Sequence, residues 1–133
     1  MTGKHLTVDS EELLQLNQRL LDAIAEADWD VYRELCDPTL TAFEPEAKGQ
    51  LVEGLEFHSF YFNRKRPKGD YQTTMCSPKV RIMGEVALIA YVRLNQRVGD
   101  DGLPVSNAVE ETRIWQHQDG KWKHVHFHRS VIG

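Results

Sequence analysis

Nine consecutive residues from 86 to 94, Val-Ala-Leu-Ile-Ala-Tyr-Val-Arg-Leu, are almost all aliphatic, β-branched or aromatic. Such residues fit the pleated, half-buried surface of a sheet, so the run predicts a strand. Similar runs fill the second half of the chain, and we expect strands at 71–76, 80–83, 86–94, 108–117 and 122–128. The dipeptide at 119–120, Asp-Gly, favours a two-residue hairpin between the last two, because both turn positions need positive φ. A further hairpin is expected at 99–102.

The first half of the chain has helical periodicity. Apolar residues recur there at three- and four-residue steps, which predicts one amphipathic helix over about 10–27. The stripe consists of Leu13, Leu16, Leu20, Ile24 and Ala27. Asp9 and Glu12 resemble a capping box at its start, so residues 1–8 are expected to form a short tail. Asp28 resembles the N-cap of a second, short helix that Pro38 ends.

A short strand at 40–43 and a third helix at about 54–65 complete the first half. The third helix is apolar on more than one side, which indicates burial against two surfaces. Its aromatic residues are Phe57, Phe60, Tyr61 and Phe62. Helices first and an antiparallel meander second is an α+β order. We therefore expect one domain over 9–133, a cone formed by a curled antiparallel sheet around the long helix, with a ligand site at its mouth.

Composition excludes several classes of protein. The chain has 133 residues and a formal net charge of −4, which argues against a nucleic-acid or anionic-membrane binder. No apolar run approaches the roughly 20 residues that span a bilayer, and the first five residues lack a signal-peptide pattern. Cys36 and Cys76 stand alone, so two buried, reduced thiols are expected rather than a disulfide. These features predict a cytoplasmic domain.

Three arginines occupy comparable places on three successive predicted strands: Arg93, Arg113 and Arg129. By strand parity, Arg93 and Arg129 each share a face with apolar residues. A guanidinium on such a face needs a negative partner, because burying it alone is costly. Glu111, Glu110 or an external carboxylate could supply the charge. Alternatively, the arginines are solvated strand ends.

Histidines offer two weaker candidate sites. His58 and Tyr61 lie three residues apart on the third helix and share a face, so they form either an acid–base pair or a packed core contact. His124, His126 and His128 alternate and would project from one face of the last strand, a row that could bind zinc or copper. No carboxylate or cysteine motif completes a coordination sphere, so no metal is expected. There is also no phosphate loop or nucleophile motif, and we expect no cofactor.

Longer blocks of the sequence resemble a known family, the association (hub) domain of calcium/calmodulin-dependent protein kinase II. The blocks lie in collinear order from about residue 11 to residue 130. They are Cys-Asp-Pro (36–38), Leu-Thr-Ala-Phe-Glu-Pro-Glu-Ala (40–47), Leu-Val-Glu-Gly-Leu (51–55), Phe-His-Ser-Phe-Tyr-Phe (57–62), Ile-Ala-Tyr-Val-Arg-Leu (89–94), Glu-Glu-Thr-Arg-Ile-Trp (110–115) and Asp-Gly-Lys-Trp-Lys-His-Val-His-Phe-His-Arg-Ser (119–130).

The resemblance implies a nuclear-transport-factor-2-like, cystatin-like fold and a non-catalytic hub that assembles with itself into rings. It also implies a tethered Ser/Thr kinase domain and a calmodulin-binding segment in a parent protein, for which 133 residues leave no room here. Finally, it implies a deep pocket for a small carboxylate or other anion. Its expected ligand residues are Arg93, Arg113 and Arg129, with His58 at the rim, and Tyr61 and Glu111 nearby.

Two departures from the family pattern affect this expectation. Arg66, within the basic stretch 64–66, stands where animal hubs have a mobile tryptophan, and the tail after Ser130 is only three residues long. The same cone also hosts isomerases, dehydratases and cyclases, so a small enzyme is the rival interpretation. Arginines hold anions well but carry protons poorly, which favours binding over catalysis. A free-standing anion-binding protein is a third possibility that shares the pocket.

Overall fold

The computed structural model describes residues 2–63 and 69–132. Its helices are α1 (Thr2–Glu26), α2 (Trp29–Leu35), the one-turn 3-10 helix η1 (Pro45–Ala47) and α3 (Glu56–Phe62). Its strands are β1 (Cys36–Phe43), β2 (Val52–Glu53), β3 (Tyr71–Met83), β4 (Val86–Val98), β5 (Pro104–Gln118) and β6 (Lys121–Val131). The helices precede the long strands, as the α+β prediction requires.

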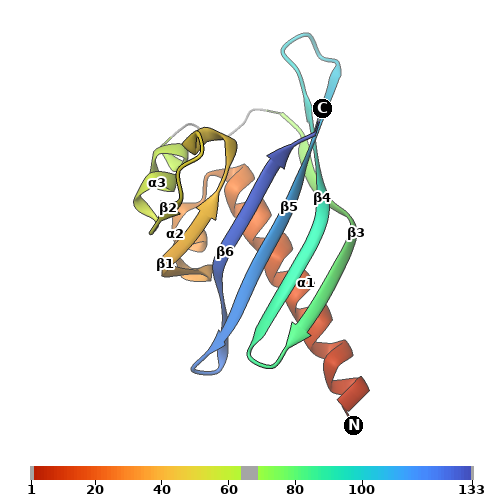
Figure 1. Ribbon diagram of the computed structural model, residues 1–133. Helices are drawn as coiled ribbons and strands as arrows, with labels where there is room; N and C mark the ends of the chain where they lie inside the picture. Colours follow the sequence, from red (N-terminus) through yellow and green to blue (C-terminus); the bar gives the residue numbers. More distant parts are fainter. Residues whose placement is uncertain (1, 64–68, 133) are drawn as a thin grey trace.

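Within the described residues, six strands form one sheet in the order β2-β1-β6-β5-β4-β3 (Figure 1). β3 to β6 pair antiparallel in sequence order, which confirms the predicted meander. Asp119 and Gly120 adopt φ of 48° and 82° at the last hairpin, as the turn requires. β1, however, lies parallel to β6. Parallel strands need a long connection, and here most of the chain supplies it.

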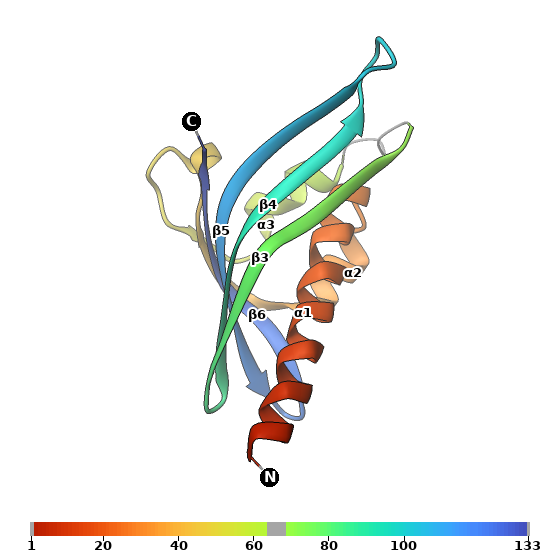
Figure 2. The same ribbon diagram turned by 90° about the vertical axis from the view of Figure 1, so that its right-hand side faces the viewer.

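The sheet curls, and α1 lies along its concave side (Figure 2). Leu13 and Leu20 of the predicted stripe are fully buried, and Leu16 and Ile24 pack against the edge of the same cluster. β3 is the strand that α1 approaches over the longest stretch. The predicted cone, a curled sheet packed around a long first helix, is confirmed.

The start of α1 differs from the prediction. The helix begins at Thr2, so residues 2–8 continue it instead of forming a tail, and Asp9 lies within it rather than at a cap. Residues 2–12 contain no proline, and each residue added to an existing helix gains one hydrogen bond. The helix ends at Glu26 because Ala27 turns left-handed, with φ of 56°. The Asp28 amide then donates to the Ala23 carbonyl at 2.8 Å.

The two shorter helices were predicted with mixed success. Asp28 caps α2 as expected, since its carboxylate accepts from the Val31 amide at 3.2 Å. The chain passes directly from α2 into β1 at Cys36, so Pro38 lies in a strand and does not end the helix. α3 is a short helix, Glu56–Phe62, and residues 64 and 65 of the predicted helix lie outside the described residues. The predicted burial of α3 against two surfaces is wrong, because Phe57 and Phe60 are exposed.

Two features of the meander lengthen its strands. The segments 71–76 and 80–83 are one strand, β3, with an irregularity between Cys76 and Lys79 where Ser77 adopts φ of 50°. Such a bulge bends a strand without ending it, which explains why Ser77-Pro78 did not separate two strands. β4 and β5 continue past the expected ends to a loop at 99–103. Their hairpin projects beyond the rest of the sheet (Figures 1 and 2).

We expect Leu20→Ala to lower the free energy of unfolding by about 2–5 kcal/mol, because it leaves a cavity between α1 and the sheet. Gln15→Ala, an exposed position on the same helix, is the matched control and should change it by less than about 0.5 kcal/mol. Denaturant unfolding followed by circular dichroism measures both. Equal effects of the two substitutions would contradict the packing described for α1.

Candidate ligand-binding pocket

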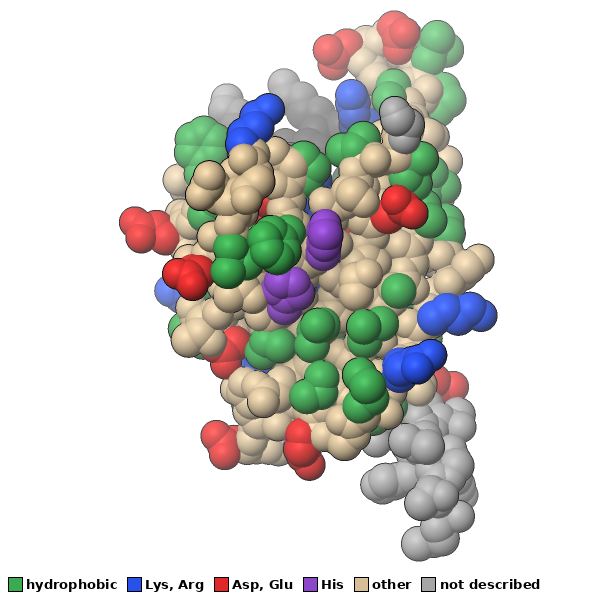
Figure 3. Space-filling model, viewed as in Figure 1, with side chains coloured by type: hydrophobic (Ala, Val, Ile, Leu, Met, Phe, Trp, Pro, Cys, Tyr) green, Lys and Arg blue, Asp and Glu red, His purple; other side chains and the backbone are tan. Residues whose placement is uncertain are grey.

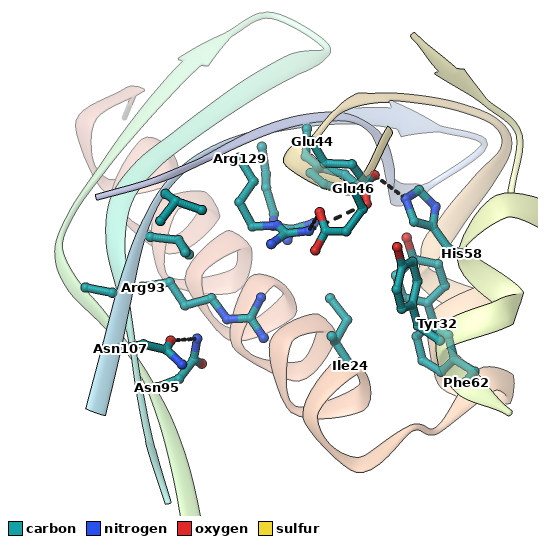
Figure 4. Close-up of a pocket in the computed structure, with 16 residues that line it drawn as sticks. Ile24, Tyr32, Glu44, Glu46, His58, Phe62, Arg93, Asn95, Asn107 and Arg129 are labelled. Carbon is teal, nitrogen blue, oxygen red and sulfur yellow. Dashed lines mark hydrogen bonds and ion pairs between the residues drawn. The ribbon is translucent and has the colours of Figure 1, made fainter. Parts of the chain in front are cut away.

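A cavity of about 640 Å³ lies between the curled sheet and the helices. Residues of α1, α2, α3, β4, β5 and β6 line it, together with Glu44 and Glu46 on either side of Pro45. Figure 4 shows Arg93 and Arg129 on one side of the cavity and the ring of His58 on the other. The cone prediction placed a ligand site at the mouth of the cone, and this cavity is the candidate for that site.

The structure brings five of the six predicted site residues to this cavity. Arg93, Arg113, Arg129, His58 and Tyr61 all line it. The sixth, the carboxylate at position 111, is buried behind the arginines and does not line it. Strand parity predicted that Arg93 shares a face with the apolar residues of β4. Every second side chain of this strand from position 87 to position 93 is buried.

Glu111 is the carboxylate that pairs the two inner arginines. Its Oε2 accepts from Arg93 Nη1 at 3.2 Å and from Arg113 Nη2 at 3.1 Å. Burial alone would raise the pKa of Glu111, but the two guanidiniums outweigh it and lower this pKa to about 2. Of the partners considered from sequence, the charge therefore comes from Glu111 and not from Glu110, which is exposed on the other face of β5.

Arg113 uses its guanidinium mainly for contacts inside the protein. Its Nε donates to the Tyr91 hydroxyl at 3.1 Å and to Glu111 Oε1 at 3.2 Å. The guanidinium also stacks over the Phe127 ring, 4.4 Å from its centre. Its Nη1 lies 3.4 Å from His124 Nε2. Burial would lower the pKa of Arg113, and the Glu111 charge more than reverses this, so the group stays charged.

A polar side chain of α1 completes the inner network. Asn17, which is fully buried, donates from Nδ2 to the Tyr91 hydroxyl at 2.9 Å and accepts from Trp115 Nε1 at 3.0 Å. The Tyr91 hydroxyl in turn donates to Glu111 Oε1 at 2.6 Å. Sequence reasoning missed Asn17. The available signal was its position within the apolar stripe, one turn after Leu13.

A second network, which sequence reasoning also missed, forms the rim of the cavity. Arg129 Nη2 donates to Glu46 Oε1 at 2.6 Å and lies 3.5 Å from Glu44 Oε1. Glu44 Oε2 is 2.5 Å from His58 Nε2 (Figure 4). Partial burial raises the pKa of Glu46, but the Arg129 contact dominates and lowers it overall. His58 was expected at the rim and is instead buried at the end of this network.

The predicted row of three histidines on β6 is wrong. Trp115 pairs with His124 but Ile114 pairs with His126, so the register shifts and alternation breaks at Val125. His124 is therefore buried inside, where its pKa falls well below the ordinary value because of burial. The side chains of His126 and His128 lie on the outer face instead. Across the part of the chain that the structure describes, no group of His, Cys, Asp and Glu could hold a metal ion.

The cysteines are both free thiols. Cys36 is buried, and its Sγ lies 3.4 Å from His124 Nδ1. Burial raises the pKa of Cys36 to about 12, so it is a neutral thiol rather than a nucleophile. Cys76 is only half-buried, whereas both cysteines were expected to be buried.

Among the helices that the structure describes, no apolar stretch has the length needed for a membrane span.

Comparison with known proteins gives close matches over nearly the whole chain. Residues 9–133 match the family described as the calcium/calmodulin dependent protein kinase II association domain. The delta subunit of calcium/calmodulin-dependent protein kinase type II from Oryctolagus cuniculus is 46% identical over 123 residues. The match covers 90% of this chain and 23% of that subunit, so the chain spans about a quarter of its length.

Solved structures agree with the sequence matches. The calcium/calmodulin-dependent protein kinase II hub homology domain of Chlamydomonas reinhardtii is 46% identical, with a TM-score of 0.87 over 94% of this chain and 99% of that one. A nuclear transport factor 2-like protein from Salmonella enterica has a TM-score of 0.76 at 18% identity, over 96% of this chain and 94% of that one. The second likeness shows the fold alone, and it confirms the predicted fold class.

We expect Glu111→Gln to lower the free energy of unfolding by about 3–5 kcal/mol, because two buried guanidiniums lose their charged partner. The folded-state pKa of Glu111, about 2, lies below the ordinary value of 4.5. Its stabilising contribution is therefore complete above about pH 5 and is lost as the pH falls toward about 2. Unfolding measured across this range should show a smaller loss in Glu111→Gln than in the parent protein, because only other carboxylates with a lowered pKa, such as Glu46, still contribute.

The matched control for this experiment is Glu110→Gln, one residue earlier and exposed on the opposite face of β5. It should change the free energy of unfolding by less than about 0.5 kcal/mol and keep the parent's acid dependence. If Glu111→Gln kept the parent's acid dependence as well, another carboxylate would be responsible for it.

Proposed function

The chain belongs to the calcium/calmodulin-dependent protein kinase II association-domain family, and on this basis we propose that it is a self-associating hub whose copies close into a ring. A contact repeated between identical chains commonly closes with rotational symmetry. The descriptions of its relatives as association and hub domains support the proposal. In a kinase subunit, such a hub would hold tethered kinase domains together.

The outer face of the sheet supports self-association. On β4, the side chains that alternate with the buried ones point outward and are apolar, and Ile114 of β5 lies beside Leu88. Figure 3 shows apolar side chains spread over this face. The outward apolar residues are Phe43, Met83, Val86, Leu88, Val92, Leu94 and Ile114. Extended apolar surface of this kind marks interaction sites in soluble proteins.

The isolated chain is expected to form particles larger than a dimer, with a mass that is a multiple of 15.3 kDa. Light scattering coupled to size exclusion measures this mass directly. Leu88→Asp should shift the particles to smaller sizes, because it places a charge on the apolar outer face. Gln15→Asp, on the exposed side of α1, should not. A parent protein that runs as a 15.3 kDa monomer at micromolar concentration would rule out the hub.

The second part of the proposal is that the pocket holds a small carboxylate-bearing ligand. Arg93 and Arg129 support this proposal, because their guanidiniums face the same cavity from β4 and β6 (Figure 4). A guanidinium offers a planar pair of donors that matches a carboxylate. Arg113 contributes its charge from behind, since its own donors already face Glu111 and Tyr91.

The charges around the pocket predict modest affinity. Each of the three arginines already has an internal carboxylate partner, because Glu111 serves the inner two and Glu44 and Glu46 serve Arg129. From the sequence, an external carboxylate was one of the partners that could supply the negative charge for these arginines. With three carboxylates beside three arginines, a ligand must instead exchange with existing contacts, and a small ligand has few atoms to bury.

The proposal is one of binding rather than catalysis. Guanidiniums are poor proton carriers, because their pKa lies above roughly 12. The candidate acid–base pair from sequence is His58 with Tyr61, and the Nε2 of His58 is engaged by Glu44. Its Nδ1 is buried and has no hydrogen-bond partner among the residues that the structure describes. In this arrangement neither ring nitrogen is positioned to exchange a proton with a ligand.

Calorimetric titration should show that butyrate binds more tightly than butyramide, its uncharged analogue of similar shape. Arg129→Met should weaken butyrate binding by about 10- to 100-fold, because charge-assisted hydrogen bonds contribute about 1.5–3 kcal/mol. Arg33→Met, an exposed arginine on α2, is the control and should bind like the parent. Equal binding of butyrate and butyramide, or parent-like binding by Arg129→Met, would refute the carboxylate site.

A further inference from the structure

The carboxylates that hold the pocket arginines differ in how firmly they are fixed. The Glu111 side chain has no exposed surface, and the Glu44 side chain is 2% exposed and bound to His58. The Glu46 side chain is 37% exposed, yet it makes the shortest contact to Arg129, at 2.6 Å. Glu46 is therefore the carboxylate that can move from an arginine into water.

The backbone that carries Glu46 is small. It sits on η1, a single 3-10 turn whose internal hydrogen bonds are those from the Ala47 and Lys48 amides, each 3.1 Å long. Ala47 is the buried residue of this turn. The ion pair between Glu46 and Arg129 connects the turn to β6 across the rim. Loss of this pair would leave the turn attached through Ala47 and the flanking chain.

We propose that Glu46 acts as a built-in competitor at Arg129, which a ligand carboxylate must replace in order to bind. The inference rests on the proposed pocket function. Glu46 occupies the donor edge of the one pocket arginine whose partner can be exchanged for another. A bound carboxylate takes over the Arg129 hydrogen bond, and the Glu46 side chain turns outward to water.

The exchange makes ligand selection depend on the rest of the ligand. Replacing one carboxylate by another on the same guanidinium changes the free energy little, since the charge and the hydrogen bond are conserved. The net gain then comes from apolar groups of the ligand that contact the walls of the cavity, such as Ile24, Phe62 and Val109. The class of ligand that follows is a monocarboxylate with a short apolar chain, in preference to a bare inorganic anion.

Three variants test the competition, with butyrate titrated by calorimetry. Glu46→Gln removes the competing charge, and we expect binding to tighten by about two- to five-fold, the value of an exposed ion pair. Glu46→Asp keeps the charge but withdraws it by about 1.5 Å, one carbon–carbon bond, and should tighten binding as well. Glu53→Gln, an exposed carboxylate on β2, should bind like the parent.

The Asp variant separates competition from a general effect of charge. If Gln tightens binding but Asp does not, Glu46 acts only through its charge and the competitor is refuted. Unchanged or weaker binding by both variants refutes it too.

A readout without a carboxylate keeps the inference testable even if the protein binds no butyrate. Phenylglyoxal modifies accessible arginines, and peptide mass spectrometry locates the modified residue. Arg129 should react faster in Glu46→Gln and Glu46→Asp than in the parent, while Arg113 should stay unreactive in all three. If Arg129 reacts equally in all of them, Glu46 does not shield it and the inference fails, whatever the outcome of the butyrate titration on the parent.

Discussion

One buried carboxylate, Glu111, is the constraint on which the interior of this fold depends. Taking a charge out of water is costly unless its partners are already in place, and here two guanidiniums and a hydroxyl share it. β4 and β5 must therefore keep the register that sets Tyr91 opposite Glu111. α1 must keep Asn17 against the same hydroxyl. The long helix and the curled sheet are joined at their centre by polar contacts as well as by apolar packing.

The three pocket arginines differ in how deeply they are buried. Arg113 is 1% exposed and belongs to the core, whereas the Arg129 side chain is 20% exposed at the rim and is paired with the more exposed Glu46. Arg93 is intermediate, since it is paired with the buried carboxylate but its guanidinium faces the cavity. Buried contacts hold the inner guanidiniums in position. In the proposed exchange, a ligand changes only the contacts at the rim. Rigid support beneath a more exposed edge is the arrangement that the proposed anion site requires.

The sequence could predict those parts of the structure that follow from regular alternation. Period and parity located α1, the meander and Arg93 beside apolar neighbours, and they offered Glu111 as its partner. A one-residue bulge at Val125 reversed the faces of β6, which no periodic pattern reveals, so the side chain of His124 was misplaced. Glu46 was missed because it lies on an irregular segment, whose contacts are set by the fold and not by spacing. The long blocks of family resemblance, by contrast, predicted the family and the fold class, which the comparisons confirm.

The most direct measurement is a crystal structure of the chain grown with butyrate. In this structure the butyrate carboxylate should lie within hydrogen-bond distance of Arg129 and Arg93. Glu46 should be turned toward solvent, while Glu111 keeps the contacts that it has here. A structure in which Glu46 still holds Arg129 and butyrate lies elsewhere would contradict the account, as would one in which Glu111 has left its two arginines.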